Sequence, residues 1–140
     1  MSRVKEVPWI VIFISCLAFL VWFAGCATPG NAEETGCNPK IEYQVTPEAE
    51  VTQLKCGFET YKGEPSVIFT AGVKNVSGAP LRYRLNIFLM DMDKAAGHLI
   101  PVKGNPPVLE PGKEQTVKIP FIKTTDAPER VLIVVKTVGY

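Results

Sequence analysis

Hydrophobic and polar residues alternate with a period of two along much of the chain beyond residue 40. The clearest example is residues 81–91, where five apolar or aromatic side chains line one face: Leu81, Tyr83, Leu85, Ile87 and Leu89. A period of two is typical of a strand with one buried face. No helical stripe interrupts this pattern, so we expect a domain built from strands.

Seven segments fit this description and are separated by turn-forming residues at intervals typical of β-sandwiches. They are residues 40–45, 53–60, 67–73, 81–91, 99–102, 115–121 and 131–138. We predict an all-β fold, an Ig-like antiparallel β-sandwich of about seven strands. Residues 91–97 are expected to form a loop. The last segment is continuously apolar, so we expect both of its faces to be covered.

The N-terminus has the layout of a secretory signal. Arg3 and Lys5 precede an uncharged apolar run from Trp9 to Phe23, and Ala24 and Gly25 follow as small residues. The predicted organisation is a signal peptide over residues 1–25, a tether over 26–36 and the β-domain over 37–140. The signal helix therefore precedes a domain that lies beyond the inner membrane.

The stretch Phe23-Ala24-Gly25-Cys26 resembles the lipobox of bacterial lipoproteins. The resemblance implies that the Cys26 thiol is acylated, as by palmitate, and that cleavage makes this cysteine the first residue. Ala27, in place of an aspartate, implies anchoring in the outer membrane with the domain facing the periplasm. Inner-membrane anchoring on the periplasmic side is the alternative.

Two other interpretations of the N-terminus stay open. Residues 9–27 carry no charge and are just long enough to cross a bilayer as an uncleaved anchor. Cleavage near Gly30 to Ala32 would instead release a soluble periplasmic protein.

The four cysteines divide into two groups under the lipoprotein interpretation. Cys16 leaves with the signal and Cys26 carries lipid, so Cys37 and Cys56 remain as an even pair in an oxidising compartment. We predict a disulfide between them. A hairpin of residues 40–45 and 53–60 would place the two cysteines nearly opposite each other.

Charge gives little information on partners. The chain has a formal net charge of +1, and its charged residues are dispersed singly. Nucleic-acid binding is not expected, because it requires a basic stripe or patch.

Catalytic signatures are equally scarce. The one histidine, His98, lies in the predicted loop region with no acidic neighbour in sequence. Asp91-Met92-Asp93 resembles the opening of a calcium loop but lacks the later oxygen ligands. We expect no catalytic residues, metal or cofactor, and hence no enzyme.

Three short motifs resemble FxLYD-type and YcfL-type bacterial lipoprotein domains. They are the Asn75-Val76-Ser77 turn, the strand end Ile87-Phe88-Leu89-Met90-Asp91 and the turn Leu109-Glu110-Pro111-Gly112. The resemblance covers residues 67–138. It implies an Ig-like fold, an envelope location and no established catalytic residues.

Phe88 and Met90 are apolar residues on the otherwise polar face of the longest predicted strand, with Met92 beyond them. Either this strand is buried on both faces, or these residues form a partner-binding patch rimmed by Arg82 and Arg84. The expected function is that of a non-catalytic lipoprotein, attached to the lipid bilayer through Cys26. It would act as an accessory or assembly factor that docks on an envelope protein through this patch or a sheet edge. The alternative is a small-ligand-binding module with a deep apolar pocket between its sheets.

Overall fold

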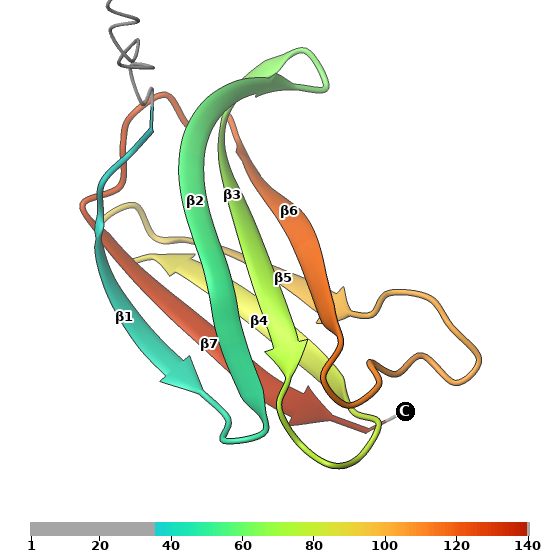
Figure 1. Cartoon of the computed structure of the whole chain (residues 1–140). Coiled ribbons are helices and arrows are strands. Elements are labelled where there is room, and N and C mark those ends of the chain that lie inside the picture. Colours follow the sequence, from blue (N-terminus) through green and yellow to red (C-terminus); the bar gives the residue numbers. More distant parts are fainter. Residues whose placement is uncertain (1–35, 140) are drawn as a thin grey trace, which may run out of the picture. The chain divides into compact units, whose positions relative to one another are not determined.

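The computed structural model describes residues 36–139, which form two β-sheets packed face to face (Figure 1). The predicted signal peptide and Cys26 lie outside the described residues. The predicted all-β sandwich of seven strands is confirmed. Its strands are β1 (Lys40–Val45), β2 (Ala49–Tyr61), β3 (Glu64–Asn75), β4 (Arg82–Leu89), β5 (Lys94–Ile100), β6 (Glu114–Ile122) and β7 (Arg130–Val138).

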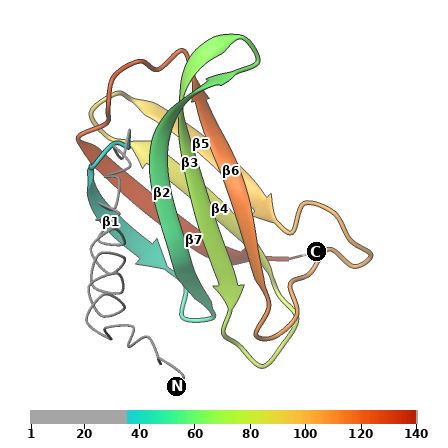
Figure 2. The same cartoon turned by 45° about the horizontal axis from the view of Figure 1, so that its top comes forward.

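One sheet has four strands in the order β1-β7-β4-β5, and the other has three in the order β2-β3-β6. Figure 2 shows the three-stranded sheet in front of the four-stranded sheet, with the strands of the two layers crossing. β3 pairs with β6, while the strands that follow each of them, β4 and β7, pair in the other sheet. The chain therefore passes repeatedly between the layers, as in Ig-like sandwiches.

β1 departs from the antiparallel expectation because it pairs in parallel with β7. The predicted hairpin of residues 40–45 and 53–60 is wrong, since β1 and β2 belong to opposite sheets. The Lys40 amide donates to the Glu129 carbonyl at 2.8 Å, which fixes the start of this parallel pair. Alternation along a strand determines which face is buried, but it does not determine which strand lies alongside.

The inner faces of the two sheets form one core. Phe69 and Phe121 meet edge to face in its three-stranded half, with ring centroids 5.7 Å apart. Tyr83 is completely buried, and its hydroxyl donates to the Glu48 carbonyl at 2.9 Å. Each large apolar side chain buried in this way contributes about 1.5–3 kcal/mol, so the two sheets are held mainly by these contacts.

β5 begins earlier than the sequence indicates. Residues 91–97 were expected to form a loop, but only residues 90–93 form a turn and β5 starts at Lys94. The loop prediction is therefore wrong for most of this segment, and His98 lies inside a strand. The reason is that Ala95, Ala96 and Gly97 are small and show no alternation, yet they pair continuously with β4.

Candidate functional site

Asn75 joins two of the motifs that resemble the lipoprotein domains. Its side-chain amide donates to the carbonyls of Ala79 and Leu109, both at 2.8 Å, and its oxygen accepts from the amide and hydroxyl of Ser77. The Gly112 amide donates to the Asn75 carbonyl at 2.8 Å. Asn75 is completely buried. These contacts give the residue an architectural role, because every polar group of its side chain is used within the fold.

Asp91, the last residue of the motif Ile87-Phe88-Leu89-Met90-Asp91, has a similar role at the start of β7. Its two carboxylate oxygens accept hydrogen bonds from the amides of Glu129 at 3.0 Å and Arg130 at 3.2 Å. The hydrogen bond from the Glu129 amide is the main reason that the pKa of this carboxyl lies below its ordinary value. Asp91 therefore holds the β4–β5 turn against the beginning of β7.

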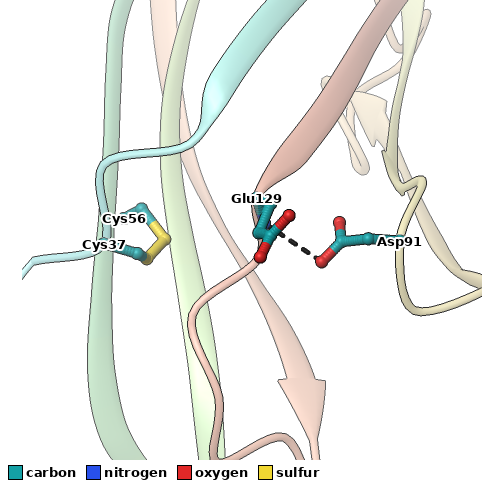
Figure 3. Close-up of a disulfide and its surroundings, with 4 residues drawn as sticks. All are labelled: Cys37, Cys56, Asp91 and Glu129. Carbon is teal, nitrogen blue, oxygen red and sulfur yellow. Dashed lines mark hydrogen bonds between the residues drawn. A yellow bond between two sulfur atoms is a disulfide. The ribbon is translucent and has the colours of Figure 1, made fainter.

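The predicted disulfide between Cys37 and Cys56 is present (Figure 3). Cys37 lies just before β1, which belongs to the four-stranded sheet, and Cys56 lies in β2, which belongs to the three-stranded sheet. The two Cα atoms lie 5.3 Å apart, within the usual range for a disulfide. The disulfide therefore closes one side of the sandwich and does not stabilise a hairpin.

Three of the predicted partner-binding residues share the outer face of the four-stranded sheet. Tyr83 and Leu85 point into the core, so the alternate residues Arg82, Arg84 and Phe88 face outward. Met90 lies beyond the end of β4, in the turn, with 48% of its surface exposed. Met92 packs against the core. The structure thus groups Phe88 with the two arginines and places the methionines elsewhere.

Phe88 belongs to an apolar strip that crosses this face. It lies between Ala95 of β5 and Leu132 of β7, and both Phe88 and Leu132 are half-buried. Leu99 and Val134 extend the strip on the neighbouring strands. All strands of residues 36–139 belong to the two sheets, so none of them covers this face. The expectation that both faces of the last strand are covered is wrong: on its outer face Arg130 and Lys136 are exposed, and only Val134 is buried, by neighbouring side chains.

The charges on this outer face are mainly basic. Its outward positions carry five cationic side chains and one acidic side chain: Lys40, Arg82, Arg84, Arg130, Lys136 and Glu42. Glu42 pairs with Arg130 at 3.4 Å. Arg84 and Lys136 are directly opposite each other on β4 and β7, an arrangement that costs stability because like charges repel. Neither forms a salt bridge with any residue of the described domain.

The outer face of the three-stranded sheet differs. Its outward positions carry four acidic and three basic side chains: Glu50, Glu59, Glu64, Glu114, Lys55, Lys74 and Lys118. Lys118 pairs with Glu59 at 3.3 Å, and Glu114 accepts a hydrogen bond from Thr52 at 2.6 Å. This face thus neutralises most of its own charge, so we take the four-stranded face as the candidate interaction site.

A hollow of about 420 Å³ lies on the candidate face beside β5. It is lined by Arg84, Asn86, Gly97, His98, Leu99 and Val102. The Asn86 side chain lies close against Gly97, because a Cβ at position 97 would be only 2.6 Å from the Asn86 Oδ1. A larger residue at position 97 would therefore clash with Asn86. The neighbouring loop is held by Arg82, whose Nε donates to the Pro101 carbonyl at 3.2 Å. The hollow combines a cation, an amide and apolar walls.

His98 lies inside β5. It lies opposite Leu85 on β5, and no group of three or more histidine, cysteine or acidic side chains in residues 36–139 is placed to hold a metal ion. Within the same range, no helix has the length and apolarity needed to cross a bilayer. His98 is one of the residues that line the hollow.

Sequence reasoning missed Leu99, Leu132, Lys136 and Gly97 as parts of the candidate face. For Lys136 a signal was present, because alternate residues of 131–138 must point away from the core. The continuous apolar run concealed that alternation. Gly97 could not have been found locally, since its role depends on Asn86 of the adjacent strand.

No family model, curated protein or solved structure matches this chain.

Proposed function

We propose that this chain is a non-catalytic lipoprotein anchored through acylated Cys26 in the bacterial outer membrane, with its β-sandwich in the periplasm. The sandwich acts as an accessory or assembly module that docks on another envelope protein. The observation that carries the docking proposal is the outer face of the four-stranded sheet. There the strip around Phe88 adjoins Arg84 and Lys136, two cations without an ion-pair partner in the described domain.

Apolar side chains beside basic ones suit a protein interface. Aromatic residues and arginine are enriched at the centres of interfaces, because both combine a large contact area with directional interactions. The repulsion between Arg84 and Lys136 would be relieved by an acidic group from a partner. The anchor rests on the sequence: the resemblance at Phe23 to Cys26 and the basic residues Arg3 and Lys5 before the apolar run.

Photo-crosslinking in intact cells tests the docking proposal. A photoreactive amino acid at Phe88 should capture one dominant envelope protein, whereas the same amino acid at Lys55 on the opposite face should not. A second variant, Phe88→Asp, should abolish capture by a probe placed at Leu132, while the melting temperature changes by only a few degrees. Equal capture at Phe88 and Lys55, or none at either, contradicts the proposal.

The small-ligand alternative has less support. It calls for a deep apolar pocket between the sheets, but the side chains there, such as Val67, Phe69 and Ile133, are completely buried against one another. The hollow beside Gly97 is on the outer face of a sheet. A ligand between the sheets would have to displace core side chains, which costs stability.

A further inference from the structure

β5 is the edge of the sandwich with the fewest features that prevent another strand from joining it. From Ala95 to Ile100 it carries no lysine, arginine or acidic residue and no proline, and its register with β4 is continuous. Natural proteins usually protect sheet edges with charges, prolines or bulges. Its backbone hydrogen bonds within residues 36–139 are made to β4 alone.

The other three edges are protected. β2 has a bulge between Val51 and Gln53 and carries Lys55 on its outer face. β6 carries Lys118 and Pro120, and a proline cannot donate to a neighbouring strand. β1 carries Glu42 and is tied close to β2 by the disulfide that precedes it. β5 is therefore the exception among the edges.

We propose that β5 binds an extended, acidic segment of a partner protein, which joins the four-stranded sheet as a fifth strand. This inference rests on the proposed docking function and names the edge and the chemistry of the partner. Alternate residues of β5 direct both their N–H and C=O groups away from β4, so a segment of similar length could form about six or seven backbone hydrogen bonds.

The hollow beside Gly97 supports an acidic side chain in the added strand. A strand on β5 would lie roughly 10 Å from β4, which is two inter-strand spacings. Arg84 lines this hollow, so a glutamate or aspartate of the added strand could reach through it toward the guanidinium group. The Asn86 amide borders the same space, and Leu99 provides an apolar wall. Arg84 would then gain the counter-charge that the domain does not supply.

A peptide-binding experiment on the full-length protein in detergent tests this proposal. The probe is a fluorescein-labelled, eight-residue peptide of alternating valine and aspartate, and a matched peptide has lysine in place of aspartate. Fluorescence anisotropy should show the acidic peptide binding at least tenfold more tightly. Arg84→Glu should invert this preference, while Lys55→Glu, a matched charge reversal on the opposite face, should leave it unchanged.

Backbone pairing is tested with modified peptides. In one version of the acidic peptide every valine is N-methylated, and in another every aspartate. Only one of these sets of amides can face β5, so one version should lose binding at least tenfold and the other should retain it. Equal binding of the two versions, or no saturable binding of the acidic peptide, overturns the proposal.

Two further outcomes separate this inference from the proposed function. A partner captured at Phe88, with no acidic-peptide binding, overturns the β5 inference and leaves the docking proposal intact. Acidic-peptide binding with no capture in cells overturns the docking proposal and leaves the β5 inference intact. Light scattering tests whether the protein forms dimers. Dimers that Ala95→Lys disrupts would identify a second copy of this chain as the occupant of β5, and would overturn the proposal of an acidic partner segment.

Discussion

The side chain of Asn75 lies at the junction of two loops that are far apart in sequence. Its amide bonds to Ala79 and Leu109, while its backbone carbonyl receives the Gly112 amide. Hydrogen bonds in a buried site contribute to stability and are not replaced by water when they are removed, so the contacts of Asn75 are costly to lose. Asn75 and Asp91, the polar residues of the motifs, thus stabilise the fold, whereas Arg84 on the outer face forms no salt bridge within residues 36–139.

Replacing Asn75 should destabilise the domain strongly. Asn75→Ala removes the two hydrogen bonds donated by its side-chain amide and the oxygen that accepts from the Ser77 amide and hydroxyl, and we expect a loss of about 3 kcal/mol in the free energy of unfolding. Urea denaturation measures this loss. The control is Val76→Ala at the exposed neighbouring position, which should change the free energy by less than about 0.5 kcal/mol. Similar effects of the two substitutions would contradict the role given to Asn75.

Asp91 gives the domain a pH dependence of predictable sign. Its pKa is lowered in the folded state, chiefly by the Glu129 amide. The unfolded chain therefore binds the proton more readily, and the stabilisation by Asp91 is present above about pH 4 and lost as the pH falls through the folded pKa. We expect Asp91→Asn to lower the melting temperature at pH 7, and the difference from wild type to shrink at pH 3. A difference that grows on acidification would contradict this assignment.

At the scale of elements, the least predictable feature is the position of β1. Its own residues, with Ile41 and Val45 directed inward, specify a strand with one buried face. They do not specify that the strand lies parallel to β7 in the sheet opposite β2. The hairpin that would have supported the predicted disulfide does not form, but the disulfide is compatible with the observed arrangement because the sheet edges carrying β1 and β2 lie close together.

Removing the disulfide should loosen β1 more than the rest of the sandwich. Cys37→Ser combined with Cys56→Ser should lower the free energy of unfolding by about 3 kcal/mol, the value for closing a loop of this length. Hydrogen exchange should accelerate at the β1 amides, and much less at those of β3, which is the central strand of the other sheet. Uniform acceleration in every strand would show that the disulfide acts on the whole fold.

At the scale of the whole molecule, the two outer faces differ in whether their charged side chains are paired with opposite charges. The three-stranded sheet pairs Lys118 with Glu59, whereas the four-stranded sheet places Arg84 beside Lys136 with no acid between them. This asymmetry arises only when β4 and β7 pair, since the two residues are far apart in sequence. It gives the proposed module one face for a partner and one for solvent.

The proposed anchor predicts where the molecule resides in the cell. Cys26→Ser should remove metabolic labelling by palmitate and shift the protein from the membrane fraction to the soluble periplasmic fraction, because the acyl chains supply the membrane affinity. Fractionation with an outer-membrane marker measures the shift. Ala27→Ser, which keeps the thiol, is the control. Continued membrane association of Cys26→Ser would support the uncleaved anchor of residues 9–27.

The sequence by itself determined the all-β class, most of the strands and the inward residues of β4. It could do so because alternation records the burial of each residue locally, as at Tyr83, Leu85 and Ile87. Cysteine parity was enough to predict the disulfide. Only the tertiary structure decided the parallel β1–β7 pair, the strand character of residues 94–97 and the meeting of Arg84 with Lys136. These features depend on contacts between segments distant in sequence, and the sequence of one strand does not specify which strand pairs with it.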